Sequence, residues 1–328
     1  MRRFQTKDRI IEGRPVYLGP TQLTVLARDG RLWDLDRSVI PASQVLGDPF
    51  RSMSQGEMRA ALLAEFGGGF DVSGTGHYLV VHPAGQRDLW AQRFEDLYRQ
   101  MLRYFAVRRI EVRSPTFPLV AVVFRSQSEF QAHAARQGAQ AGGNLLGYYD
   151  PDSNRIFLFD VTAGGRDEED WRENAATIVH EAAHQSAFNI GIHSRFTLPP
   201  RWLAEGIGTL FEAPGVYDSS RFGHLHDRIN VGQYAAYRRY FANATDSTGV
   251  LKSIVAQDQG FGYPQYAISW ATLLLFTEQE PEKLSRYLKI TAGKSPFVKV
   301  PAARRIADFQ SAFGPDIDAW ETRVHRYL

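Results

Sequence analysis

The sequence predicts an α+β protein, with strands gathered in the first half of the chain and helices in the second. Two observations support this class. Up to about residue 160, short apolar runs are bounded by glycine and proline, whereas the later sequence has apolar residues at helical spacing. Strands followed by helices are typical of α+β proteins, and a doubly wound sheet would show regular alternation instead.

Composition narrows the possible classes of protein. The chain has 328 residues, of which 44% are hydrophobic and 23% are charged, so disordered and fibrous proteins are excluded. The net charge of +2 gives no reason to expect a nucleic-acid partner. There is no cysteine, which excludes disulfides, thiolate metal sites and cysteine nucleophiles. Any metal site must therefore use His, Asp and Glu.

Residues 1–72 are predicted to form a small β-rich module with a connecting helix. Asp29-Gly30 is a strong hairpin signal between apolar runs. A helix is expected over residues 54–66, because Ser54 and Glu57 have the spacing of a capping box and a run of three glycines follows. The strands expected before this helix are residues 16–18, 24–27 and 31–35.

Residues 73–328 are predicted to form the second and larger domain. Its first part alternates buried strands with amphipathic helices, and strand patterns stop after Asp160. The elements expected in this first part are a strand at 78–81, a helix at 86–105, a strand at 119–124, a helix at 128–137 and a hairpin over 147–159.

The segment 170–190 is predicted to be a helix, and it contains His180-Glu181-Ala182-Ala183-His184. Residues four apart on a helix share a face, so the two imidazoles can converge on one cation. Glu181 projects beside that face, where it can act on a water molecule at the metal. This pattern is the signature of zinc hydrolases, although the same spacing also arises by chance on core helices.

A third metal ligand is expected 21 residues after His184, at Glu205. The proline pair at 199–200 begins a second predicted helix, which places this carboxylate in its first turns. Packed against the first helix, it would complete a His₂Glu site with an open fourth position. The alternative interpretation is a solvated surface glutamate, but flanking Trp202 and Leu203 are unusual for a solvated face.

These two motifs resemble those of the gluzincin metallopeptidases, in which a Trp-x-x-Glu-Gly segment supplies the glutamate ligand. Here that segment is Trp202-Leu203-Ala204-Glu205-Gly206. More narrowly, the chain resembles the bacterial peptidase-MA-like proteins, whose substrates are mostly unassigned. The resemblance is specific over residues 145–215.

The resemblance implies a thermolysin-like zincin domain with a small sheet, the motif helix and a helical C-terminal lobe. It implies that His180, His184 and Glu205 hold one Zn²⁺ per chain and that Glu181 is the general base of peptide-bond hydrolysis. Residues 157–159 would then be the edge strand along which an extended peptide lies.

The sequence departs from the family at Thr209. Many relatives carry an acidic residue at this point, four positions after the glutamate ligand, and it bonds to a ligating histidine. A hydroxyl can accept the imidazole N–H but raises ligand basicity less than a carboxylate does. Glu212 and Glu173 are the candidates to replace that acid.

A donor to the developing oxyanion is also needed, and Tyr263 and Tyr266 are the candidates. Tyr266 is preferred because it opens a predicted helix, and a core aromatic with a satisfied hydroxyl is the competing interpretation. His193 could face the cleft without binding metal. His224 and His226 have strand-like spacing for a second metal, which we regard as the less favoured interpretation.

Two functions of different class remain open. One is an active zinc metallopeptidase acting on peptide or protein substrates, and the other is a weak or inactive gluzincin-fold binding or scaffold protein. The intact Glu181 favours the enzyme. No run approaches the about 18 apolar residues of a membrane span. The basic start lacks the apolar core of a signal peptide. The compartment stays open, since an extracytoplasmic location is compatible with a signal peptide removed earlier. The oligomeric state stays open as well.

Overall fold

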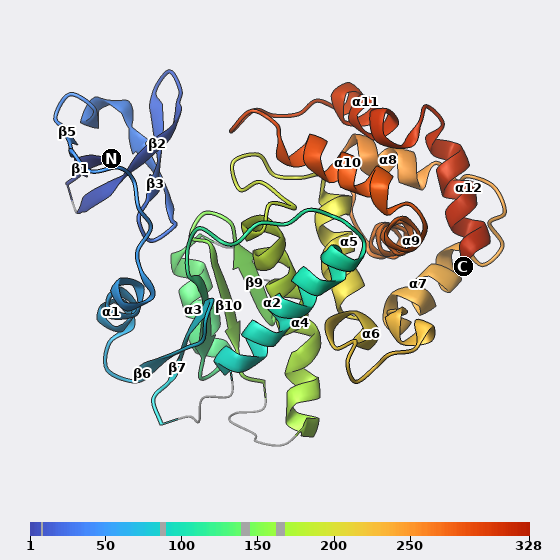
Figure 1. Ribbon diagram of the computed structural model, residues 1–328, viewed down its shortest axis with the longest axis horizontal. Coiled ribbons are helices and arrows are strands. Elements are labelled where there is room, and N and C mark those ends of the chain that lie inside the picture. The colour runs from blue at the N-terminus through green and yellow to red at the C-terminus, as the bar shows by residue number, and fades with distance from the viewer. Residues whose placement is uncertain (8, 86–89, 139–144, 162–167) are drawn as a thin grey trace. The chain divides into compact units, whose positions relative to one another are not determined.

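The computed structural model describes residues 1–7, 9–85, 90–138, 145–161 and 168–328 (Figure 1). The chain forms two compact units, Met1–Glu95 with Pro115–Asn174 and Asp96–Ser114 with Ala175–Leu328. All described strands belong to the first unit, and the second is helical. The predicted α+β class is therefore confirmed. The predicted domain boundary between residues 72 and 73 stays a prediction.

The first unit begins with an antiparallel sheet in the order β4-β3-β2-β1-β5. Its strands are β1 Arg2–Gln5, β2 Ile10–Leu18, β3 Gln22–Ala27, β4 Leu32–Asp36 and β5 Gln44–Val45. The three predicted strands are confirmed, but β1 and β5 were not predicted. Phe4 is the one buried side chain of β1, and both residues of β5 are exposed, so neither strand has an apolar pattern of its own.

This sheet has its own small core of buried side chains. Its members are Phe4, Ile11, Leu23, Val25, Ala27 and Leu35. Gly30 has φ of 88° in the turn between β3 and β4, a conformation that glycine adopts without strain. The predicted Asp29-Gly30 hairpin is thereby confirmed.

A second, mixed sheet has the order β6-β7-β8-β10-β9. Its strands are β6 Phe70–Gly74, β7 Tyr78–Pro83, β8 Leu119–Phe124, β9 Gly147–Asp150 and β10 Arg155–Phe159. β7, β8 and β10 are parallel, while β6 and β9 are antiparallel strands at the two edges. The prediction that residues 157–159 form an edge strand is wrong, because β10 pairs on both sides. All five residues of β10 are buried, as expected of an inner strand.

Helices α1 Gln55–Phe66 and α3 Gln127–Arg136 pack on this second sheet. The capping box of Ser54 and Glu57 is present, and Gly67 ends α1, as predicted. Met58 and Leu62 of α1 join the core of the second sheet. α2, Trp90–Val107, covers most of the predicted helix over 86–105, whose first four residues lie outside the described part of the chain.

The helical unit is built around α9, Tyr263–Gln279, which packs against α5, α7, α8, α10, α11 and α12, and Figure 1 shows it among these helices. Residues 267–277 of α9 are all buried, so this stretch of the helix is enclosed on every side. Gly206 of α5 permits a close approach, because a Cβ atom there would lie 2.8 Å from Leu273 Cδ1. The remaining helices are α4 Glu168–Asn189, α5 Arg201–Phe211, α6 Pro214–Tyr217, α7 Val231–Phe241, α8 Val250–Ala256, α10 Pro281–Ala292, α11 Ala302–Phe313 and α12 Ile317–Tyr327.

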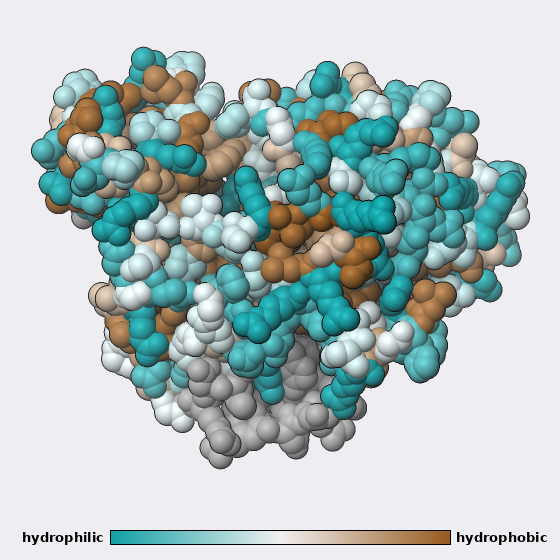
Figure 2. All heavy atoms as spheres, viewed as in Figure 1, coloured by the Kyte–Doolittle hydropathy of each residue, from teal (hydrophilic) through white to brown (hydrophobic). Residues whose placement is uncertain are grey.

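The visible surface of the helical unit is mostly hydrophilic (Figure 2). Helices such as α10, α11 and α12 have alternating buried and exposed positions, as amphipathic surface helices do. Of the helices that the structure describes, none combines the length and the apolar character needed to cross a bilayer.

Candidate metal centre

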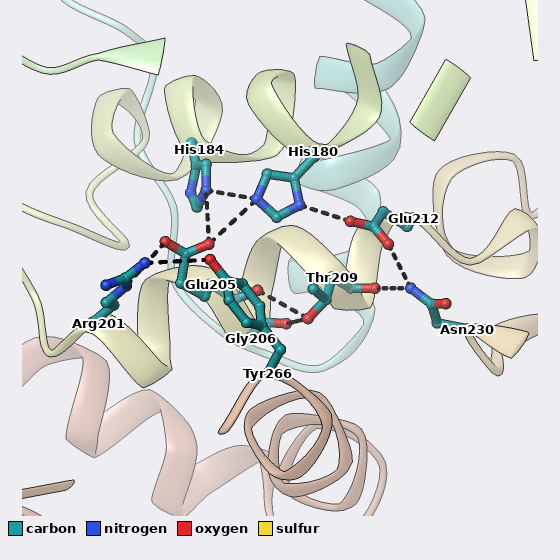
Figure 3. Close-up of polar contacts among 9 residues, drawn as sticks. All are labelled: His180, His184, Arg201, Glu205, Gly206, Thr209, Glu212, Asn230 and Tyr266. Carbon is teal, nitrogen blue, oxygen red and sulfur yellow. Dashed lines mark hydrogen bonds and ion pairs between the residues drawn. The ribbon is translucent and has the colours of Figure 1, made fainter. Parts of the chain in front are cut away.

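Helix α4 presents the two motif histidines toward one point (Figure 3). His180 Nε2 and His184 Nε2 lie 3.0 Å apart, and the two rings are nearly perpendicular at 83°. Residues four apart lie on the same face of a helix, so the two ring nitrogens come together there, as predicted. Both imidazoles are largely buried.

Helix α5 brings Glu205 to the same point. Its Oε2 lies 3.4 Å from His180 Nε2 and 3.8 Å from His184 Nε2. Pro200 immediately precedes α5, and Trp202 and Leu203 are buried, so the predicted helix start is confirmed and these flanking residues do not lie on a solvated face. Among the residues that the structure describes, this trio is the one group of His, Asp and Glu side chains that could hold a metal ion.

The three separations fit the size of a zinc ion. A tetrahedron with metal–ligand distances of about 2.1 Å has edges of about 3.4 Å. The observed separations of 3.0, 3.4 and 3.8 Å bracket that edge. Two imidazoles and one carboxylate are a donor set that Zn²⁺ accepts in sites that keep one position open.

Gly208 makes room for the His180 ring. A Cβ atom at this position would lie 2.5 Å from His180 Cε1 and 2.8 Å from His180 Nε2. Because a glycine inside a helix costs about 1 kcal/mol relative to alanine, its presence in α5 is explained by this contact. Any larger side chain would displace the imidazole from the centre.

The outer nitrogen of His180 is held by Glu212. His180 Nδ1 and Glu212 Oε1 lie 2.7 Å apart, and Asn230 Nδ2 donates to Glu212 Oε2 at 2.7 Å. Thr209 instead uses its hydroxyl within α5, where it donates to the Glu205 carbonyl oxygen at 2.9 Å. Of the two candidates to replace the missing acid, Glu212 is therefore the one seen to contact a motif histidine, while the side chain of Glu173 lies outside the described residues.

Electrostatics favour a positive charge at this centre. Burial opposes charge on Glu205, but hydrogen bonds from His180 and His184 outweigh it and hold the pKa of Glu205 below its usual range. Burial likewise lowers the pKa of His180, yet hydrogen bonds to Glu205 and Glu212 raise it well above its usual value. A cation at this point, a proton or a metal ion, therefore has favourable electrostatic surroundings.

Tyr266 and Arg201 complete the surroundings of Glu205 (Figure 3). Arg201 Nη2 donates to the Tyr266 hydroxyl at 3.5 Å, and Arg201 Nε lies 3.7 Å from Glu205 Oε1. Burial, followed by the negative charge of Glu205, raises the pKa of Tyr266, so the phenol stays protonated. Tyr263, the other tyrosine considered, is 76% exposed. Sequence reasoning did not single out Arg201, although its spacing of four residues before Glu205 is a usable signal.

Glu181 is half-buried and follows His180 directly on α4. Its negative charge contributes to raising the pKa of His180, after the effects of burial and of the two hydrogen-bonded carboxylates. Glu181 is outside the trio whose ligand atoms converge. This placement is compatible with a base that acts next to a metal, and its role stays a prediction.

The remaining histidines named from the sequence are outside the converging trio. His193 is buried, with its ring centroid 5.2 Å from that of Phe188. That it faces the cleft stays a prediction. His224 and His226 stack at 5.4 Å on an exposed segment. Among the described residues, none of these three histidines belongs to a group of His, Asp and Glu side chains that could hold a metal ion.

Comparisons with known proteins give two kinds of match. A family model described as "Protein of unknown function (DUF1570)" matches residues 174–298, the segment that contains the trio. Among solved structures, a variant of a two-domain M1 zinc metallopeptidase bound to L-arginine has 11% identity and a TM-score of 0.39. The M1 zinc metallopeptidase from Deinococcus radiodurans gives the same two values. Each alignment covers 76% of this chain and 47% of the other, so the chain spans about half their length. No curated protein matches.

Proposed function

We propose that the chain is a zinc-dependent metallopeptidase of the gluzincin type, with His180, His184 and Glu205 as the metal ligands. One observation carries the proposal: two imidazole nitrogens and a carboxylate oxygen converge at the separations of a tetrahedral zinc site. The side chain of Glu212, bonded to the outer nitrogen of His180, supports it further. Such carboxylate–histidine pairs orient ligating imidazoles.

The reaction that suits this arrangement is hydrolysis of a peptide bond. A bound zinc ion would supply Lewis acidity, which acidifies water and polarises a carbonyl oxygen. Glu181 takes the proton of the attacking water and passes it to the leaving amine. Because neighbouring residues on a helix project about 100° apart, Glu181 stands beside the two ligands and is not one of them.

Two further groups prepare the site for this chemistry. Glu212 accepts the Nδ1 proton of His180, which leaves the Nε2 lone pair directed at the metal position. Tyr266 is a protonated phenol next to Glu205, and it donates to the substrate oxygen on which negative charge develops. The presence of Glu181 beside two ligands supports an enzyme over an inactive scaffold, which has no use for a base there.

Metal analysis combined with peptide cleavage tests this proposal. Purified protein should contain about one zinc per chain, and His184→Ala should remove it. The exposed His226 offers a matched control, since His226→Ala should keep the zinc. Zinc-loaded wild-type protein should cleave members of a diverse peptide pool. Full zinc in His184→Ala, or no cleavage by the loaded wild type, would contradict the proposal.

A further inference from the structure

Arg201 is the first residue of α5 and lies one helical turn before Glu205, so their side chains leave the same face of the helix. Its contacts there are long, at 3.7 Å to Glu205 Oε1 and 3.5 Å to the Tyr266 hydroxyl (Figure 3). Bonds between charged groups are usually about 2.7–2.9 Å. The guanidinium therefore lies beside the candidate metal centre without a tight partner.

Two neighbouring residues, Phe261 and Asp258, help to place the guanidinium. Its central carbon lies 4.9 Å from the centre of the Phe261 ring, and its backbone N–H donates to Asp258 Oδ1 at 2.8 Å. The Asp258 carboxylate is already paired with both terminal nitrogens of Arg305, at 2.6 and 2.7 Å. Aromatic stacking and a fixed backbone orient the planar fork of Arg201 while leaving its charge accessible.

Arg201 also has side-chain N–H groups that are not used in hydrogen bonds within the described residues. Its side chain is 43% exposed, compared with 19% for Glu205, so it can be reached from solvent. Within the described residues, Nη1 of Arg201 has no hydrogen-bond acceptor. Once Glu205 is committed to a metal ion, the remaining side-chain acceptor of the guanidinium is the neutral phenol of Tyr266. The guanidinium fork of Arg201 is therefore available to bind an anionic group from solvent.

We propose that Arg201 recognises a carboxylate of the substrate beside the scissile bond, and that the preferred substrates are peptides that carry one there. The inference rests on the proposed peptidase function. A guanidinium fork binds a carboxylate through two parallel hydrogen bonds, which gives orientation as well as affinity. The carboxylate has two possible sources, the α-carboxylate at the end of a peptide and the side chain of an internal Asp or Glu.

The experiment measures peptide binding to zinc-loaded Glu181→Gln protein by calorimetry, so that the peptides stay intact. Three probes separate the sources: acetyl-Ala-Phe-Ala with a free carboxylate, the same peptide as its amide, and acetyl-Ala-Phe-Glu-Ala-amide. Each is titrated into the parent and into versions that also carry Arg201→Gln, Arg201→Lys or Arg286→Gln. Arg286 is an exposed arginine of α10 and serves as the matched control.

The parent and the Arg286→Gln protein should bind one carboxylate probe about 10- to 100-fold more tightly than the amide, as expected for hydrogen bonds between charged groups. Arg201→Gln should abolish this preference, and Arg201→Lys should keep part of it, because the charge remains but the fork is lost. Preference for the free end indicates the α-carboxylate, and preference for the internal glutamate indicates an acidic side chain. A preference that persists in Arg201→Gln, or none in the parent, would overturn the inference.

The failure of this inference can be told apart from failure of the proposed function. If wild type and Arg201→Gln both hold zinc and cleave free and amidated peptides at equal rates, the function stands and the inference is overturned. If the protein binds carboxylate peptides through Arg201 but cleaves none, recognition is supported and the peptidase function is contradicted.

Discussion

Glu321 of α12 and Glu205 of α5 both lie beside imidazoles in the helical unit, but their oxygens have different partners. Glu321 is fully buried and accepts backbone N–H bonds from Thr248 at 2.9 Å and Leu251 at 3.0 Å. Glu205 Oε2 instead lies 3.4 and 3.8 Å from ring nitrogens of the two α4 histidines. A carboxylate saturated by backbone donors has little capacity left, whereas Glu205 keeps lone pairs that a cation can use.

The lowered pKa values of these two groups do not separate their roles. Burial opposes charge on Glu321, but hydrogen bonds from His325 and Thr248 outweigh it and lower its pKa to about 2. The pKa of Glu205 is lowered as well, by hydrogen bonds from its imidazole neighbours against the effect of burial. What distinguishes a candidate ligand from a structural carboxylate is therefore which donors satisfy its oxygens.

The largest effect is expected at Glu181. Glu181→Gln keeps the size of the side chain but removes the proton acceptor, so peptide cleavage should fall by about 10²–10⁴-fold. Zinc content and thermal melting should stay near those of wild type. Cleavage rates and elemental analysis on the same preparations check this. Undiminished cleavage would favour the scaffold interpretation, and joint loss of zinc and activity would make Glu181 structural.

The next largest effect is expected on protein stability, at Glu321, the structural carboxylate of the two compared above. Its pKa is about 2 in the folded protein against an ordinary value of 4.5, so the folded state favours the charged form. This stabilisation is complete above pH 4.5 and is lost as pH falls through about 2. The difference corresponds to about 3 kcal/mol of unfolding free energy.

Urea unfolding as a function of pH measures this contribution. Glu321→Gln should lower the unfolding free energy at neutral pH and flatten its decline between pH 4.5 and about 2. Zinc content should not change, because Glu321 is not part of the converging trio. Coincident stability curves for the variant and wild type would show that the Glu321 network is not stabilising.

Local signals predicted the elements that depend on local geometry. The capping box before α1 and the apolar run of β8 gave correct elements, and β8 has the predicted bounds. β1, β5 and β6 are short strands with few buried residues, and each exists because a neighbouring strand pairs with it. The order of strands in a sheet is not encoded locally, which is why β10 was wrongly expected at an edge.

In the candidate site, too, some features follow from local sequence and others depend on how the helices pack. The convergence of His180 and His184 follows from the period of a single helix, and the sequence predicts it. The approach of Glu205 depends on how α5 packs, and the sequence supports it only through a proline start and buried flanks. The choice of Glu212 needed the fold, because Asn230 reaches it from a distant segment. Arg201 resembled an ordinary surface arginine until its neighbours were known.

The smallest of these effects is expected on zinc affinity, at Glu212. It tests whether a carboxylate bonded to a ligating imidazole supports metal binding, as a structural carboxylate does not. Glu212 accepts from His180 Nδ1 through one oxygen and from Asn230 Nδ2 through the other. In Glu212→Gln one of these oxygens becomes an NH₂ group, which cannot accept, so the variant loses its charge and one of the two contacts.

Loss of such an outer carboxylate typically weakens metal binding by about 10- to 100-fold. Competition with a chromophoric chelator should therefore show a raised zinc Kd for Glu212→Gln, with urea unfolding of the metal-free protein nearly unchanged. Glu321→Gln provides the matched control, because the same chemical change at a carboxylate remote from the trio should leave the zinc Kd as in wild type. Equal zinc affinities for Glu212→Gln and wild type would show that the Glu212 carboxylate does not contribute to metal binding through His180.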